Sequence, residues 1–414
     1  MPYVAGGTLT LAEEKNMTTI ALVNVPARGH INPTLPIVRE LVARGHALHY
    51  FVASKCRGIV EGVGASFHAL PHIERIGAGA AGPPAPPGDR ELALLPFVMA
   101  CQSTEVVPQL VETIRSLGAQ CLVYNTLSLW ARLAGEFLRL PTVGFRPFHA
   151  PRSPRAVTGP FATESLAQLA DAAERALAQL AQAFERLPPS LDSLVSQSEN
   201  PTLIFMPREF AFEAESFDER FLFVGPSLPE VPPEPWPFES TPDGARRRAY
   251  VSLGTLRNDD PAFYRLCFSA FEPGAWEVVM SVGERVDLTA LAPFPANFLV
   301  APSVRQIAVL PHADVFVTHG GLNSVMESLY FGVPMVVIPS IGEQRLTGSR
   351  IGALGLGVAL EREAVTRERL RDSASRVARN ASVLARIAPM RDRVRAAGGY
   401  LRAADAIVQR ASRS

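Results

Sequence analysis

The sequence predicts an α/β protein made of two doubly wound, Rossmann-like domains that face each other across a cleft. Two buried strand runs near the start, 20–25 and 46–52, enclose a helical segment and so form a βαβ unit. A second unit of strand, glycine turn and helix, 315–329, leads into another buried run at 335–338. Between the two halves, residues 226–245 are dense in proline and acidic residues, which is typical of a linker.

The composition favours a protein of several domains that binds small molecules. The chain has 414 residues, enough for two to three domains, and 47% of them are hydrophobic, which supplies ample cores. With 40 basic and 40 acidic residues the formal net charge is zero, so nothing indicates nucleic acid or an anionic membrane as a partner. We expect small-molecule ligands, and a monomer or homodimer.

The cysteines and the N-terminal segment indicate a reducing compartment. The four cysteines, at positions 56, 101, 121 and 267, stand singly, without C-x-x-C pairs or histidines at ligand spacing. No apolar run approaches the roughly 18–20 residues that span a bilayer, and residues 1–16 lack the apolar core of a signal peptide. We expect a cytoplasmic protein without an integral membrane segment, in which residues 1–16 are a disordered extension.

The turn after the first strand carries a candidate catalytic residue. Residues 26–33 read Pro-Ala-Arg-Gly-His-Ile-Asn-Pro, and a helix with Leu35, Val38 and Leu41 on one face follows them. His30 therefore lies outside the carboxyl end of a parallel strand, where α/β sheets place polar ligand contacts. A single histidine there can also be a helix-start residue that bonds only to the backbone.

The remainder of the first half alternates further strands with loops and one long helix. Strand runs at 121–124 and 141–145 continue the sheet, and short runs at 203–206 and 221–224 complete it. Residues 76–87, rich in Gly, Ala and Pro, form either a plain surface loop or a flap over a ligand. Apolar residues at helical spacing between positions 164 and 187 predict a helix that packs in the core or in a pocket wall.

The second half contains the best-defined motif of the chain. Strands at 249–253, 277–281 and 297–301 precede the run Val317-Thr318-His319-Gly320-Gly321-Leu322-Asn323-Ser324, in which Asn323 and Ser324 can cap a helix. The first turn of a helix leaves N–H groups unpaired, and its macrodipole adds roughly half a positive charge. The two glycines let a diphosphate approach those donors, so the run predicts an anion site. A glycine turn alone can also serve only packing.

Together these motifs resemble the nucleotide-sugar-binding signature of the family 1 glycosyltransferases, and in particular the bacterial macrolide and natural-product glycosyltransferases. The resemblance covers nearly the whole chain from Met17. It implies the two-domain GT-B architecture, with an acceptor domain at 17–225, a linker at 226–245 and a nucleotide-sugar domain at 246–390. The last residues, 391–414, are then a helix that packs back on the acceptor domain.

The resemblance also implies a role for individual residues. His30 is the general base that takes a proton from an acceptor hydroxyl while that oxygen attacks the anomeric carbon, which inverts the sugar. The nucleoside-diphosphate sugar, UDP- or TDP-linked, contacts Thr255, Ser303, Val304, Gln306, His319, Gly320, Gly321, Asn323, Ser324, Glu327, Glu343 and Gln344. A small hydrophobic natural product contacts Phe97, Phe145, Phe148 and His149. No cofactor and no metal are implied, and Asp259-Asp260 reads as a helix cap before Pro261.

Three positions depart from the family pattern. Asn125 stands where relatives carry an Asp that stabilises the imidazolium of the base, and a neutral amide lacks that charge and can hold the wrong tautomer. Ser303 replaces an aromatic that stacks on the nucleobase, and Glu343 replaces a shorter Asp. Either His30 works with weaker support, or another carboxylate substitutes, or the protein is a nucleotide-sugar-binding pseudoenzyme or accessory protein. A nucleotide-sugar epimerase of the same shape is a further alternative.

Overall fold

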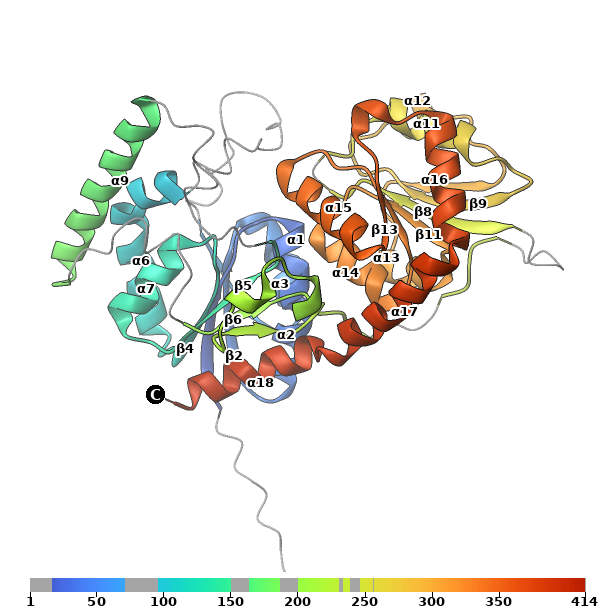
Figure 1. Cartoon of the computed structure of the whole chain (residues 1–414). Coiled ribbons are helices and arrows are strands. Elements are labelled where there is room, and N and C mark those ends of the chain that lie inside the picture. Colours follow the sequence, from blue (N-terminus) through green and yellow to red (C-terminus); the bar gives the residue numbers. More distant parts are fainter. Residues whose placement is uncertain are drawn as a thin grey trace, which may run out of the picture.

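The computed structural model describes residues 17–70, 96–149, 164–186, 200–230, 234–238, 246–255 and 257–413. It contains two α/β domains, each built on one parallel sheet with helices on both faces (Figure 1). The predicted fold class is therefore confirmed. The expected extension 1–16 and the loop 76–87, the predicted surface loop or flap, lie outside the described residues.

The first domain holds a sheet of seven parallel strands in the order β3-β2-β1-β4-β5-β6-β7. The chain leaves β1 in one direction and later returns to β4 on its other side, so the switch point of the topology lies between these two strands. The strands are β1 (Thr19–Val23), β2 (Ala47–Val52), β3 (Ser66–Ala69), β4 (Cys121–Asn125), β5 (Thr142–Arg146), β6 (Thr202–Ile204) and β7 (Phe221–Phe223).

Two helical layers cover this sheet because its strands are apolar on both faces. One layer packs into a core around Tyr50 and Val123, and consists of α1 (Arg28–Ile31), η1 (Asn32–Thr34), α2 (Leu35–Ala43), η2 (Ser54–Cys56) and α3 (Arg57–Glu61). The other packs around Trp130 and Leu122, and consists of α6 (Ser103–Ser116), α7 (Leu129–Leu138) and α9 (Glu164–Ala183). The long helix α9 buries Ala173, Leu177 and Leu180 in this core.

The second domain holds six parallel strands in the order β10-β9-β8-β11-β12-β13. Its switch point lies between β8 and β11, and β11 leads into the glycine-rich turn. The strands are β8 (Arg247–Ser252), β9 (Trp276–Ser281), β10 (Phe298–Ala301), β11 (Val315–Thr318), β12 (Met335–Val337) and β13 (Gly357–Ala359).

Helices again cover both faces of the second sheet. On one face lie α11 (Pro261–Ala270), α12 (Leu288–Leu291) and α16 (Arg367–Arg379). On the other lie α13 (Gln306–Val309), η6 (Leu310–His312), α14 (Leu322–Phe331), α15 (Gly342–Leu354) and α17 (Ala381–Ala396). Short 3-10 turns occur at η4 (Arg208–Phe210), η5 (Ala214–Ser216) and η7 (Arg362–Ala364). No helix among the described residues is long and apolar enough to cross a membrane.

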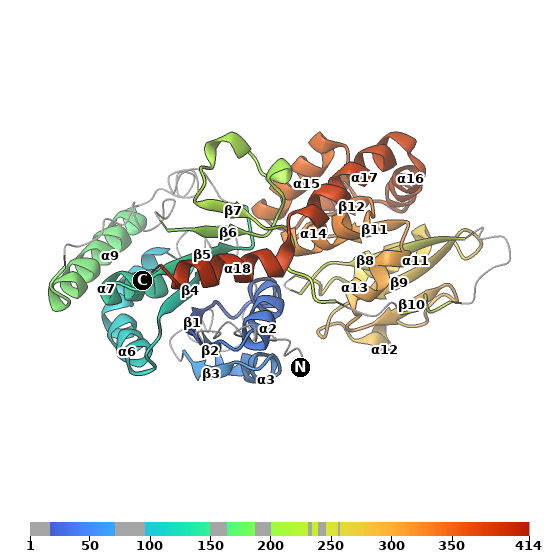
Figure 2. The same cartoon turned by 90° about the horizontal axis from the view of Figure 1, so that it is seen from below.

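The chain returns to the first domain at its end. The helix α18 (Gly399–Ala411) lies beneath the first domain in Figure 1 and beside α2 in Figure 2, and it buries Ala403, Ala404 and Ile407 in the core of that domain. The expected boundary at residue 390 falls inside α17, which runs on to Ala396. The break comes at Gly398 and Gly399, whose positive φ angles of 97° and 57° suit glycine.

The expected linker is anchored and is not a free tether. Trp236 is buried, and its indole N–H donates to Oε2 of Glu277 over 2.8 Å. Aromatic anchoring of this kind was not evident from the proline content, which predicted only an irregular segment. Residues 231–233 and 239–245 lie outside the described residues.

Candidate active site

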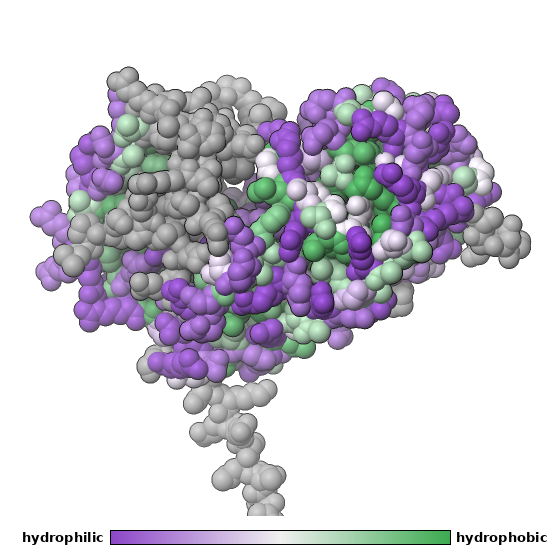
Figure 3. All heavy atoms as spheres, viewed as in Figure 1, coloured by the Kyte–Doolittle hydropathy of each residue, from purple (hydrophilic) through white to green (hydrophobic). Residues whose placement is uncertain are grey.

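The two domains touch through residues that follow the strands of both sheets. The side-chain amide of Asn323, in the first turn of α14, donates to the carbonyl of Gly29. His149 follows β5, and its Nε2 lies 3.1 Å from the hydroxyl oxygen of Thr347 on α15. In the space-filling view of Figure 3 the domains adjoin beside α15, and apolar residues gather on the second domain between α15 and α16. The edges predicted to bind acceptor and donor therefore face each other.

His30 lies at the switch point of the first sheet and contacts Asn125. The last residue of β4 is Asn125, and its Nδ2 lies 2.8 Å from Nδ1 of His30. On its other side the imidazole packs against Phe148, with ring centroids 5.7 Å apart. The structure thus brings together the two proposed catalytic residues and one proposed acceptor residue.

Backbone geometry fixes which end of the Asn125 amide faces the histidine. The N–H of Leu127 donates to Oδ1 of Asn125 over 2.9 Å, so the oxygen is held on the side away from the ring. The amide nitrogen then donates both to His30 and to Oδ1 of Asn24, which is 3.0 Å away. A flipped amide would turn its N–H groups toward another N–H group.

Asn24 is in turn fixed by its own partners. Its Oδ1 accepts the N–H of Val25 over 2.8 Å, and its Nδ2 donates to the carbonyl of His30 and to the hydroxyl of Tyr50, at 2.9 and 2.7 Å. The Tyr50 hydroxyl also lies 2.7 Å from the hydroxyl of Thr34. This buried network is fully paired around Asn24, so the orientation of both amides is determined.

The network sets the protonation of His30. Burial lowers its pKa from 6.5 to about 4, and the bond with Asn125 acts in the opposite direction. At neutral pH the imidazole is therefore uncharged. Because Nδ1 accepts the Asn125 amide, the single ring proton resides on Nε2. In this resting state Nε2 is a hydrogen-bond donor and not a proton acceptor.

The glycine-rich turn of the second domain is shaped around His319. A Cβ atom on Gly321 or on Gly254 would overlap the His319 imidazole, and one on Gly320 would overlap Val337. Gly320 also has a φ angle of 85°, which favours glycine. The glycines therefore make room for a ring between the two turns as well as for a ligand.

His319 is neutral and incompletely bonded. Burial lowers its pKa from 6.5 to about 4, and a hydrogen bond to the Ser252 backbone raises the pKa but does not cancel the effect of burial. Its Nδ1 is buried and has no hydrogen-bond partner among the residues that the structure describes. A buried ring nitrogen without a partner is the kind of group whose hydrogen bonding a ligand completes.

The start of α14 differs from the expected cap. The N-cap residue is Gly321, without a side-chain cap bond, and Asn323 and Ser324 lie within the first turn. Asn323 does not cap the helix because its amide reaches across to Gly29 in the other domain. The first-turn N–H groups of α14 thus have no side-chain cap, which leaves them available for an anion.

Glu327 and Gln306 form a pair behind this turn. Nε2 of Gln306 donates to Oε2 of Glu327 over 2.5 Å, and burial raises the pKa of Glu327 from 4.5 to about 7 in spite of that bond. Ser303 is exposed, whereas Val304 packs against the core. The structure therefore places Ser303, unlike Val304, where an added side chain would meet solvent or a ligand.

Glu343 and Gln344 begin α15 at the domain interface. Burial raises the pKa of Glu343 from 4.5 to about 7, although the backbone N–H of His149 donates to it. Gln344 is buried, and its Oε1 accepts the N–H of Ser340 over 2.8 Å. The Glu343 carboxyl group thus contacts the first domain directly, while Gln344 holds the loop after β12.

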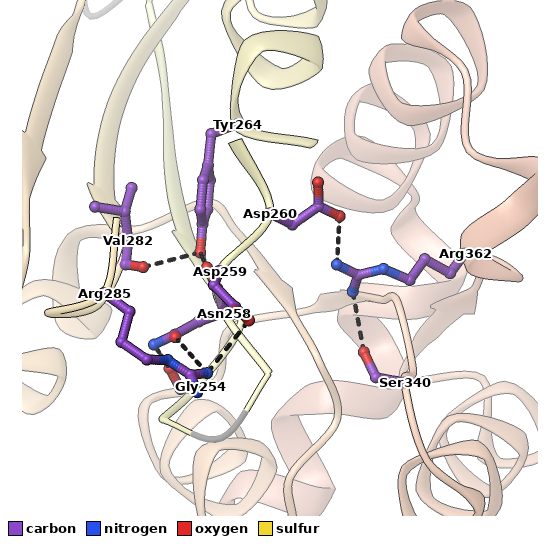
Figure 4. Close-up of polar contacts among 9 residues, drawn as sticks. All are labelled: Gly254, Asn258, Asp259, Asp260, Tyr264, Val282, Arg285, Ser340 and Arg362. Carbon is purple, nitrogen blue, oxygen red and sulfur yellow. Dashed lines mark hydrogen bonds and ion pairs between the residues drawn. The ribbon is translucent and has the colours of Figure 1, made fainter. Parts of the chain in front are cut away.

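The loop after β8 carries Thr255 on a tight turn. Nδ2 of Asn258 donates to the Gly254 carbonyl over 2.7 Å, and the hydroxyl of Tyr264 donates to the Asn258 carbonyl over 2.7 Å (Figure 4). Gly254 has a φ angle of 76°. These hydrogen bonds close the turn. Thr255 is exposed and follows Gly254, which packs against the His319 ring.

The acidic pair after this turn is used within the protein. Asp260 caps α11 by accepting the N–H of Phe263 over 3.0 Å, which confirms the predicted cap, and it also pairs with Arg362. Asp259 lies 3.3 Å from Arg285 (Figure 4). These contacts brace the loop after β8 against the loops after β9 and β13.

Not all of the proposed acceptor residues lie at this site. Phe148 and His149 do, but Phe145 is buried in the core with Phe205, at 6.1 Å between ring centroids. Alternation along β5 directs Phe145 toward the α2 layer. Phe97 packs against the core of the α6 and α7 layer.

Two site residues were missed by reasoning from the sequence. Asn24 is the polar residue inside the first strand run, and Arg146 directly follows the run 141–145. Each is a polar residue inside or next to an apolar strand run, and this feature of the sequence could have identified both. Arg146 lines a cavity of about 20 Å³ together with Phe148 and His149.

Comparison with known proteins agrees with this geometry. Residues 274–399 match the family described as erythromycin biosynthesis protein CIII-like, C-terminal domain. The chain is 34% identical to the NDP-glycosyltransferase YjiC of Bacillus subtilis, with 94% of this chain and 96% of that protein covered. It is 31% identical to demethyllactenocin mycarosyltransferase of Streptomyces fradiae, with 98% and 91% covered.

Among solved structures, the glycotransferase of kitacinnamycin superposes with a TM-score of 0.81 at 30% identity, covering 95% of this chain and 99% of that one. Fold, motifs and relatives agree over nearly the entire length. This chain belongs to the nucleotide-sugar-dependent glycosyltransferases of family 1, in the group of macrolide and natural-product glycosyltransferases with the GT-B fold.

Proposed function

We propose that this glycosyltransferase moves a sugar, with inversion, from a UDP- or TDP-linked donor to a hydroxyl of a small hydrophobic natural product. The observation that carries the proposal is the contact between Asn323 and Gly29. It joins the first turn of α14, where the donor diphosphate binds, to the residue before His30. The base and the anion site thereby form one active site.

The donor half stabilises the leaving diphosphate. The uncapped N–H groups of α14 supply hydrogen bonds where negative charge develops, and His319 adds one when its ring carries a proton on Nδ1. Thr255 adds a hydroxyl from the neighbouring turn. Glu327 holds the ribose and Glu343 with Gln344 the sugar hydroxyls, since these groups lie along the same edge of the sheet.

His30 acts as the general base after Asn125 turns its amide. A base at Nε2 needs the ring proton on Nδ1, and that requires Oδ1 of Asn125 to face the ring. The turn breaks the bonds of Asn125 with Leu127 and Asn24. Each broken hydrogen bond costs about 1 kcal/mol, so the rotation raises the barrier by about 2 kcal/mol and slows the reaction by about 30-fold. Substantial catalysis remains.

A second candidate function follows from the same network. If the Asn125 amide keeps its resting orientation, Nε2 of His30 carries a proton and cannot act as a base. The protein then binds a nucleotide sugar without transferring it. Such a protein would be an accessory or regulatory subunit. The intact anion site and the resting orientation of Asn125 both fit it.

The experiment supplies UDP-glucose or TDP-glucose with a panel of phenolic and macrolide acceptors, and measures nucleoside diphosphate release together with product mass. The wild type forms a β-glycoside from the α-linked donor, and His30→Ala abolishes it while still binding donor. Donor binding without any glycoside in the wild type would favour the second candidate. An isomeric nucleotide sugar without diphosphate release would indicate an epimerase.

A further inference from the structure

Arg146 is a buried cation of the first domain that has no ion-pair partner among the residues that the structure describes. Arg146 ends β5, the residue is only 9% exposed, and its Nε and Nη1 atoms have no hydrogen-bond partner within the described part of the chain. Its ionisable neighbour is Tyr124 on the adjacent strand β4. No carboxylate of the described residues pairs with it. An arrangement of this kind is rare because a buried charge is normally paired.

The guanidinium keeps its charge in spite of burial. Burial lowers its pKa to about 10, which is still well above neutral pH. A large apolar side chain of similar volume would avoid the desolvation of this cation. No described residue forms an ion pair with this charge, which leaves it available to a ligand.

The surroundings of Arg146 indicate where that partner lies. The cavity it lines is otherwise walled mainly by apolar and aromatic residues, among them Phe148, Phe212 and Phe223. At about 20 Å³ it has room for roughly one oxygen atom the size of a water, and not for a whole ligand. A single charged or polar group inserted from a larger molecule would fill it.

The cavity adjoins the catalytic histidine on the acceptor side. The Phe148 ring lies 5.7 Å from the His30 ring and 6.0 Å from the Arg146 guanidinium carbon, so it stands between the two. Every lining residue belongs to the first domain, whereas the donor turn belongs to the second. The missing partner is therefore part of the acceptor and not of the nucleotide.

We propose that Arg146 binds an anionic oxygen of the acceptor, a carboxylate or an ionised phenol, while the acceptor's ring system packs on Phe148. A guanidinium suits this role because it offers several N–H donors in one plane. The acceptor is then amphipathic: an apolar body, an acidic group at Arg146, and the reacting hydroxyl at His30. This inference rests on the proposed transferase function.

The test compares 3-(4-hydroxyphenyl)propanoic acid with its primary amide, which has the same shape without the charge. We expect kcat/KM of the wild type to be about tenfold or more higher for the acid, chiefly through KM. Arg146→Met removes the preference by lowering kcat/KM for the acid more than for the amide, and Arg146→Lys retains part of the preference. Arg139→Met, which removes an exposed arginine of the same domain, leaves the preference intact.

The proposal is overturned if the wild type treats acid and amide alike, or if Arg146→Met still prefers the acid. It is also overturned if Arg146→Met weakens nucleoside diphosphate binding and leaves the acid preference unchanged, because the guanidinium would then serve the donor. Melting temperatures establish that the variants fold, and Arg146→Gln serves in place of Arg146→Met if that variant does not.

If no acceptor is glycosylated, the proposed function fails, and calorimetric titration still decides the assignment of Arg146. The acid is titrated into wild type and Arg146→Met in the presence of nucleoside diphosphate. Binding to the wild type that is lost in the variant supports the anion site. Equal binding, or none to the wild type, refutes it.

Discussion

The amide nitrogen of Asn125 lies 2.8 Å from Nδ1 of His30 and donates to it. This direction follows from the N–H of Leu127, which occupies the amide oxygen. A carboxylate at the same position would accept from Leu127 with one oxygen and from His30 with the other. The two side chains are nearly equal in shape, yet they place the imidazole proton on opposite nitrogens.

Asn125→Asp is therefore expected to raise kcat by at least about 30-fold, because it removes the amide rotation and adds a charge that stabilises the imidazolium. Nitrogen NMR of the His30 ring is expected to show the proton on Nε2 in the wild type and on Nδ1 in the variant. An unchanged kcat, or a wild-type ring already protonated on Nδ1, would contradict the assignment. Asn125→Ala separates loss of the amide from gain of charge.

Gly321→Ala is expected to weaken donor binding by about tenfold or more. The new Cβ would overlap the His319 ring, while the backbone at Gly321 has a φ angle of −62° that any residue adopts. The effect is therefore steric and not a backbone penalty. Gly352→Ala in α15 is the matched control, since nothing lies within 4 Å of the added methyl group. Calorimetric titration of nucleoside diphosphate into both variants measures the difference.

Ser303→Trp is expected to tighten donor binding by about tenfold, because base–aromatic stacking contributes about 1–3 kcal/mol. Ser303 is exposed, so the indole can be added without repacking the core. Ser303→Ala should leave the dissociation constant of the nucleoside diphosphate unchanged. Equal affinity of the Trp variant and the wild type would place the nucleobase elsewhere.

Glu327 makes the stability of the free protein depend on pH. Its pKa is raised from 4.5 to about 7, so the native state binds more protons than the unfolded state between these values. The stabilising contribution is present below pH 4.5 and is lost as the pH rises through 7. Glu343 has the same shift and therefore adds to the effect.

Glu327→Gln removes one of these two groups, so between pH 5 and pH 8 the variant should lose less stability than the wild type, by about 2 kcal/mol. Urea unfolding at both pH values measures the difference. Parallel losses in both proteins would mean that Glu327 is ionised in the native state. Donor binding should weaken in the variant at either pH.

Much of the fold could be predicted from strand runs and turns, and the residues that resisted prediction show why. The runs before His30 and His319 are apolar enough to be strands in any context. The N-cap of α14 was predicted at Asn323 because asparagine is a typical capping residue. In the structure its side chain instead bonds to Gly29 of the other domain. Such a contact across domains leaves no local trace in the sequence.

The assignment of Phe145 failed for a related reason. Successive side chains along a strand point to opposite faces of the sheet. The residue that faces a pocket is therefore identified only when the residue at which the strand ends is known. β5 continues to Arg146, which puts Phe145 toward the α2 layer and leaves the charged neighbour at the cavity. For Asn125 the position was evident, but the direction of its amide depends on the N–H of Leu127, which only the fold reveals.

The return of α18 to the first domain means that the chain crosses between the domains twice, at 224–226 and at 397–399. These crossings lie side by side, because the N–H of Gly399 donates to the carbonyl of Val224 over 2.7 Å and Gly225 packs against Ala397. Two adjacent crossings act like a double-stranded hinge. Because this hydrogen bond holds the two crossings together, movement of one domain against the other is more constrained than a single linker would allow.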